Sequence, residues 1–261
     1  MSLTDKTIAS TFKDIIIISN SNVGFDTNID QVKSGNGNGS ALYLSTNNFK
    51  VQPSADSTTN SVIYDKDGNI LFQVDSTNDT VKALGNHANT QYANFGITGA
   101  GSATYVANTH YPIFFNGGTG QASGNDVDFG TGTDPDDSFT TADTDTQYAS
   151  QIVPMMWRVP DNISIDSVTH IEGADAATGD TTRMHLKSFD FTSGSTSCLA
   201  SGTLLAHNSD ITNAGNEQAY LSTWTVDSAS VAANKVVLCF FRSDSVNSDF
   251  SLNVTVKYHL T

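Results

Sequence analysis

The chain is short of basic residues and of long apolar segments, and each shortage excludes a class of protein. Lys and Arg number 12 against 27 Asp and Glu in 261 residues, which gives a formal net charge of −15. Nucleic-acid binding requires clustered basic residues that displace counterions from phosphates, and here they are scattered. Fully apolar runs such as Ile15–Ile18 and Val236–Phe241 are far too short to span a bilayer. We therefore expect no nucleic-acid partner and no membrane insertion.

Glutamate and cysteine are also scarce. Only Glu172 and Glu217 are glutamates, and the polar residues are mainly Asp, Asn, Ser and Thr. These short side chains compete for backbone hydrogen bonds and favour turns over helix interiors. No window has the apolar spacing of a long amphipathic helix, so we expect an all-β protein. Cys198 and Cys239 are the only cysteines, and both a disulfide and free buried thiols remain open.

The N-terminal "MSLTDKTIAS" has no apolar segment typical of a signal peptide, which predicts that the chain folds in the cytoplasm where it is made.

One clear structural motif is "VIYDKDGNILFQVD", residues 62–75, which predicts a hairpin. Asp67-Gly68 suits a two-residue turn, and pairing across it places Ile63 opposite Phe72. Val62 and Leu71 then fall on the other side, so both faces are partly apolar. An isolated hairpin is marginally stable in water, so another surface must cover this one.

The spacing of apolar residues along the sequence changes once, near residues 85–92. The first 85 residues have short strands, long polar spacers and little apolar area for an independent domain, and "GNHANTQY" reads as a turn or hinge. After residue 93, alternation predicts an antiparallel β-sandwich or jelly roll. "DFSLNVTVKYHL" has the pattern of a half-buried strand, and "KVVLCFFR" that of a central strand covered on both sides. "AYLSTWTV" predicts one strand with Tyr220, Trp224 and Val226 on one face. The expected strands are 104–107, 111–115, 151–159, 163–171, 181–191, 199–206, 219–226, 235–242 and 249–258.

Sequence motifs for catalysis, metal binding or phosphate binding are weak or absent. "GSTSC" from residue 194 does not match a nucleophile elbow, the six histidines lack metal-ligand spacing, and "GNGNG" from residue 35 reads as a flexible turn. The acidic segment 116–147 reads as a surface loop. It is either simply solvated or able to hold calcium through carboxylates at Asp126, Asp128, Asp134, Asp136 and Asp137. We expect no catalytic residue, no cofactor-binding residue and no resident metal.

Several stretches resemble a known class of proteins. "TIASTFKDIIII", "GNGNGSALYLSTNNFKVQP" and "VIYDKDGNILFQVDSTNDTVKALG" resemble N-terminal modules of fibre and appendage proteins of tailed, particularly marine, phages. "SIDSVTHIEGADAATGDTTRMHLKSFDF" and "FFRSDSVNSDFSLNVTVKYHL" resemble the C-terminal β-sandwich heads of the same class.

The resemblance implies a non-enzymatic virion protein, a short homotrimeric fibre or surface appendage. Residues 1–20 would attach to other virion proteins, 21–92 would form a trimeric β stalk, and 93–261 would form a jelly-roll-like head. Three chains would supply the core that the hairpin of one chain lacks. The head would contact a host-surface glycan or protein. A capsid decoration protein and a bacterial carbohydrate-binding or adhesin module are the alternatives.

Overall fold

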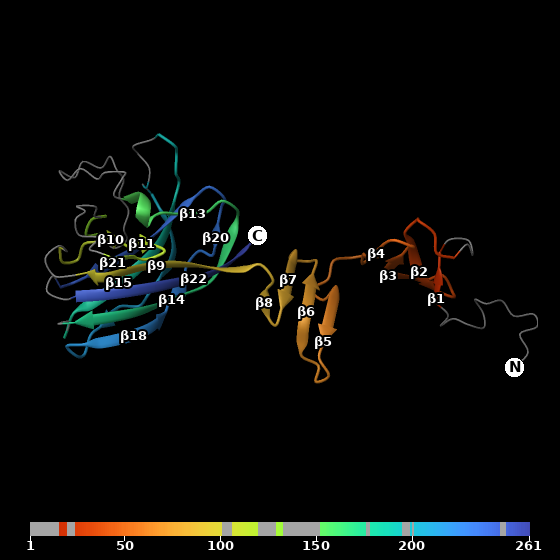
Figure 1. Cartoon of the computed structure of the whole chain (residues 1–261), viewed down its shortest axis with the longest axis horizontal. Coiled ribbons are helices and arrows are strands. Elements are labelled where there is room, and N and C mark those ends of the chain that lie inside the picture. Colours follow the sequence, from red (N-terminus) through yellow and green to blue (C-terminus); the bar gives the residue numbers. More distant parts are fainter. Residues whose placement is uncertain are drawn as a thin grey trace, which may run out of the picture. The chain divides into compact units, whose positions relative to one another are not determined.

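The chain is all-β and divides into two compact units. The computed structural model describes residues 16–19, 24–100, 106–119, 129–132, 152–175, 178–194, 199, 201–245 and 249–261. Unit one spans Met1–Ala88 and unit two spans Asn89–Thr261 (Figure 1). The division between the units lies within residues 85–92, where the sequence changes in composition, and residue 93, the expected start of the head, lies inside β9 (Thr90–Ala100).

The N-terminal unit contains two antiparallel four-stranded sheets, each with its strands in sequence order. The first, which we call the N-terminal sheet, contains β1 (Ile16–Ile18), β2 (Asp30–Ser34), β3 (Gly39–Leu44) and β4 (Phe49–Val51). The second, which we call the hairpin sheet, contains β5 (Ser61–Tyr64), β6 (Ile70–Asp75), β7 (Thr80–Ala83) and β8 (Asn86–His87). Such up-and-down order requires only short local turns.

The C-terminal unit is a sandwich of two seven-stranded sheets, antiparallel apart from the pairing of β12 with β9. The β14 sheet contains β9 (Thr90–Ala100), β11 (Phe114–Phe115), β12 (Gly118–Thr119), β14 (Ile163–Asp175), β18 (Gln218–Thr223), β20 (Ser230–Val231) and β22 (Asp249–Leu260). The β15 sheet contains β10 (Tyr111–Pro112), β13 (Trp157–Arg158), β15 (Thr181–Phe189), β16 (Thr203–His207), β17 (Ile211–Thr212), β19 (Thr225–Val226) and β21 (Val236–Ser243).

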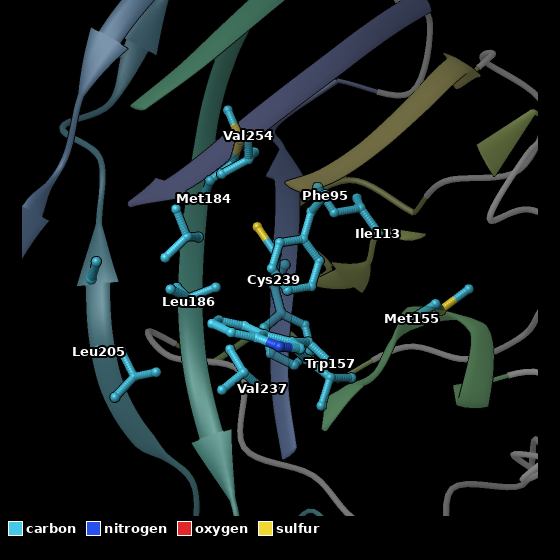
Figure 2. Close-up of a cluster of buried hydrophobic side chains, with 14 of the residues drawn as sticks. Phe95, Ile113, Met155, Trp157, Met184, Leu186, Leu205, Val237, Cys239 and Val254 are labelled. Atoms are coloured by element: carbon cyan, nitrogen blue, oxygen red, sulfur yellow. The ribbon is translucent and has the colours of Figure 1, made fainter. Parts of the chain in front are cut away.

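One buried apolar cluster fills the sandwich. Phe95 and Val254 come from the β14 sheet, while Met184, Leu186 and Cys239 come from the β15 sheet (Figure 2). β21, the predicted central strand "KVVLCFFR", lies between β10 and β15 and is buried at nearly every position, which confirms that prediction. Cys239 is free, and burial raises the pKa of its thiol, so it packs as a small hydrophobe.

The predicted strand 219–226 is two strands in different sheets. β18 pairs with β14, and β19 pairs with β16 in the opposite sheet. The chain crosses between the sheets at Trp224, whose backbone N–H donates to the Val168 carbonyl. The alternation had predicted that Tyr220, Trp224 and Val226 share one strand face. They do not, because the strand changes sheets at Trp224.

Further segments also differ from expectation. The predicted strand 151–159 contains a 3-10 helix, Val153–Met155, and only Trp157–Arg158 is strand. Pro154 lacks an N–H for a strand ladder and suits the first turn of a helix. The predicted turn or hinge "GNHANTQY" contains turn residues at 85 and 88–89 on either side of β8, and its last three residues begin β9, the eleven-residue strand that starts at Thr90. Of the predicted strand 104–107, residues 104 and 105 lie outside the described residues, and 106 and 107 are not in a strand.

Candidate oligomerisation interface in the N-terminal unit

The hairpin sheet carries one continuous apolar face. Ile63 lies opposite Phe72, as predicted, and Phe72 lies opposite Ala83 on the next strand. Val74 lies opposite Val81, two residues along on the same face. Ile63 is 59% exposed, Phe72 36% and Val81 38%. This face is therefore apolar and in contact with solvent in the single chain.

The opposite face of the hairpin sheet is partly polar and partly apolar. Val62 lies opposite Gln73, Gln73 opposite Lys82, and Lys82 opposite His87. Tyr64 shares this face with Val62 and lies opposite Ile70, and their side chains are 54% and 39% exposed. The expectation that both faces are partly apolar is therefore confirmed for β5 and β6, whereas β7 and β8 add polar side chains to this face.

The turn of the hairpin also differs from the prediction. Asp65 N–H donates to the Asn69 carbonyl, and Gly68 N–H donates back to the Asp65 carbonyl, which leaves a three-residue loop. Only Gly68 in this loop has positive φ (85°), as in a type I turn followed by a left-handed residue, whereas a two-residue type I′ turn needs two. The Asp65 carboxylate accepts from the Asn69 side chain and from backbone N–H groups, and these hydrogen bonds lower its pKa.

The N-terminal sheet repeats this arrangement. Leu44 lies opposite Phe49 and Leu42 opposite Val51, so four apolar side chains share one face of β3 and β4. Phe49 is 69% exposed and Val51 41%. On the other face, Tyr43 lies opposite Lys50, whose ammonium group sits 4.3 Å from the centre of the Tyr43 ring.

The isoleucine run ends in an edge strand of this sheet. Ile18 lies opposite Val32 of β2, whereas Ile16 is 75% exposed. The expected cover on both faces of this strand is thus not provided by the described part of a single chain. An exposed apolar edge promotes pairing with another chain, so β1 is a candidate interface strand.

Neither sheet of the N-terminal unit has a substantial hydrophobic core within the described part of one chain. Among the described residues up to Ala88, Val32 is the one apolar side chain that is buried, while thirteen large apolar side chains are exposed. All the other buried apolar side chains of the described chain belong to the C-terminal unit. The sheets of the N-terminal unit therefore expose apolar side chains of the kind that form the buried core in the C-terminal unit.

The C-terminal unit contains buried polar groups that sequence reasoning did not identify. Thr182 of β15 donates to Glu172 of β14 at 2.7 Å, and both side chains are fully buried, so this bond links the two sheets. Trp224 Nε1 donates to His170 Nδ1 at 2.6 Å, which places the proton of the neutral imidazole on Nε2. The one sequence signal for this buried contact was the scarcity of glutamate. Glu172 is one of only two glutamates in the chain and directly follows the predicted strand 163–171, which suggests a specific role.

Two histidine–aspartate pairs lie in the same unit. His207 Nδ1 is 2.7 Å from Asp227 Oδ2, and His259 Nδ1 is 2.9 Å from Asp166 Oδ1. An aspartate at this nitrogen orients an imidazole, as in a catalytic base. Within the described ranges, however, no Ser, Thr or Cys side chain bonds to the other nitrogen of His207. His185 and His259, predicted to be structural, are buried.

Several sequence hypotheses fall on residues that the structure does not describe. These are residues 1–15 of the attachment segment, the five aspartates of the calcium hypothesis, and Cys198. The "GNGNG" string is described, and it forms the turn between β2 and β3, with Gly37 at φ 88°. No described helix has the length and apolar character needed to cross a membrane.

No family model matches the chain, and no curated protein matches it in sequence. Functional inference therefore depends on the geometry described above.

Proposed function

We propose that the protein is a non-enzymatic structural component of a tailed-phage particle, a short homotrimeric fibre or surface appendage. The observation that carries this proposal is the uncovered apolar face of the two N-terminal sheets. Identical chains that pack these faces together would bury them around a shared axis. The sequence resemblance to phage fibre modules favours three chains.

The two units have complementary roles in this proposal. The N-terminal unit provides the stalk, because its sheets gain a core only by association. The C-terminal unit provides the head, because it has a closed core of its own within each chain. Loops on a rigid β scaffold are well placed to contact a host surface.

The charge of the chain limits which surfaces can associate. Three copies at −15 each repel one another, so contact is favoured only where charge is low. The apolar side of β3 and β4 and the face of Ile63 and Phe72 meet that condition.

Light scattering tests the assembly. The purified full-length chain should give a mass of three times 27.7 kDa. A stable monomer at micromolar concentration would contradict the stalk assignment.

Particle incorporation tests the attachment role of residues 1–20. Deletion of residues 2–11 should leave a soluble trimer that is absent from purified particles, as measured by immunoblot. Normal incorporation of the truncated trimer would move the attachment role to the head and favour capsid decoration. A protein that binds glycans but is never found in particles would favour the adhesin alternative.

A further inference from the structure

Two cavities adjoin at one end of the β15 sheet. The first, of about 340 Å³, is lined by Arg183, His185, Leu204, His207, Asn208, Ser209 and Asp210. The second, of about 300 Å³, is lined by Asn108, Thr181, Arg183, Asp210, Arg242 and Asp244. They share Arg183 and Asp210. Each volume lies at the lower end of the range for small-molecule sites.

The polar groups of the first cavity are held in fixed orientations. Arg183 donates to both oxygens of Asp210, at 2.6 and 2.8 Å. His207 is fixed by Asp227 through Nδ1, which leaves Nε2 as an acceptor in the neutral ring. Such preorganised groups lose little entropy when a ligand binds.

Asn208 provides an unpaired donor in this cavity. Its side-chain oxygen accepts from Met184 N–H at 2.6 Å, and the residue is 1% exposed. Its Nδ2 group has no hydrogen-bond partner in the structure. A buried donor without an acceptor is costly, so a ligand acceptor here would gain more than an exposed contact would.

The second cavity contains an arginine, Arg242, that makes no ion pair in the described part of the chain. Arg183 and Arg242 lie directly opposite each other on β15 and β21, an unfavourable pairing of like charges. They are two of only three arginines in the chain. Asp210 compensates Arg183, but Arg242 donates to the neutral Asn108 amide oxygen at 2.8 Å and has no carboxylate within 4 Å among the described residues.

The remaining charges decide which anion fits. Asp244 lines the same cavity but accepts from Thr181 N–H, and Asp210 is already paired. A bound phosphate dianion would be repelled by the carboxylates of both Asp210 and Asp244. A ligand carboxylate carries one negative charge, so its repulsion by the same two side chains is half as large. A ligand that both donates and accepts would satisfy Asp210, His207 and Asn208, and hydroxyl groups do both.

We propose that these cavities bind a carboxylate-bearing saccharide unit, with its carboxylate on Arg242 and its hydroxyl groups on Asn208, His207 and Asp210. The inference rests on the proposed function, because it names the chemistry through which the head would contact a host surface. Affinity for one unit should be weak, and several heads on one particle would raise it through multivalency.

Ligand-observed NMR and calorimetry on the full-length protein test this site. The probes are glucuronate, galacturonate, glucose and inorganic phosphate. A uronate should bind about tenfold more tightly than glucose, and the variant Arg242→Gln should remove that difference. Arg158→Gln is the matched control, because Arg158 also donates to an asparagine oxygen, Asn234 Oδ1 at 2.7 Å, outside both cavities. It should bind as the unmodified protein does.

Several outcomes would overturn the proposal. These are equal binding of uronate and glucose by the unmodified protein, an unchanged preference in Arg242→Gln, or tighter binding of phosphate than of uronate. If Arg242→Gln lowers the melting temperature, Arg242→Lys keeps the charge but loses the planar two-point contact, and it should retain part of the preference. Light scattering on the same samples separates the two hypotheses. A trimer that binds no uronate contradicts only this inference, and a monomer that binds uronate contradicts only the stalk.

Discussion

Replacement of Ile63 by Asp gives the sharpest test of the stalk. Ile63 is 59% exposed in the single chain, so in a monomer the substitution resembles an ordinary surface change of about 0.5 kcal/mol or less. In a trimer the same side chain would lie at the interface. The variant therefore separates the two states by the size of its effect.

The expected magnitude follows from the exposed fraction. Full burial of an isoleucine side chain contributes about 1.5–3 kcal/mol, so covering the exposed 59% contributes about 1–2 kcal/mol per chain. Three chains then lose about 3–5 kcal/mol. Three carboxylates about 8 Å apart near a three-fold axis would add roughly 1–2 kcal/mol of repulsion per pair at an effective dielectric constant of about 20–40. The sum weakens association by at least about four orders of magnitude.

Light scattering coupled to size-exclusion chromatography measures the result. Ile63→Asp should shift the mass from three times 27.7 kDa to that of one chain at micromolar concentration. Ile171→Asp is the matched control, because Ile171 is an isoleucine on a head strand with similar exposure, 54%. It should leave the trimer intact. A trimeric Ile63→Asp protein would show that this face is not the interface.

Further predictions concern the head. Trp224→Ala should lower the free energy of unfolding by about 3–5 kcal/mol, because the side chain is buried. Trp224→Phe should cost about 1–3 kcal/mol, because His170 Nδ1 loses its donor. A domain of this size melts about 2–4 °C lower per kcal/mol, so a shift of only a degree in either variant's calorimetric transition would contradict the buried placement of Trp224. Burial, with the neighbouring His110 and then Arg183, lowers the pKa of His185 from 6.5 to about 3. The unfolded chain therefore binds the extra proton between pH 6.5 and 3, and head stability should fall as pH falls through that window, by at most about 1.4 kcal/mol per pH unit. His185→Gln should flatten this part of the melting-temperature profile, and an unchanged slope would assign the dependence to other groups.

The amino-acid sequence by itself determined the fold class and the local pairings. A chain rich in Asp, Asn, Ser and Thr and poor in glutamate forms strands and turns here, as expected. Alternation in β22 and the apolar run of β21 identified both strands, because period-two burial is a local property. The pairing of Ile63 with Phe72 followed from the position of the turn, although the turn type was wrong. Gly68 adopts positive φ within a three-residue loop, and a two-residue loop would have required it at Asp67 as well.

Only the tertiary structure decided which segments meet across the sandwich. Trp224 lies at a crossing between sheets, and no local pattern marks the point where a strand changes partners. β9 carries Phe95 and Ile97 at alternate positions, but no strand was predicted there, and its long pairing with β22 joins segments far apart in the sequence. The facing of Arg183 and Arg242 depends on a register between strands separated by more than fifty residues. Turns and alternation are set by neighbours in sequence, whereas sheet order and register are set by burial of the whole core, which no short window of sequence contains.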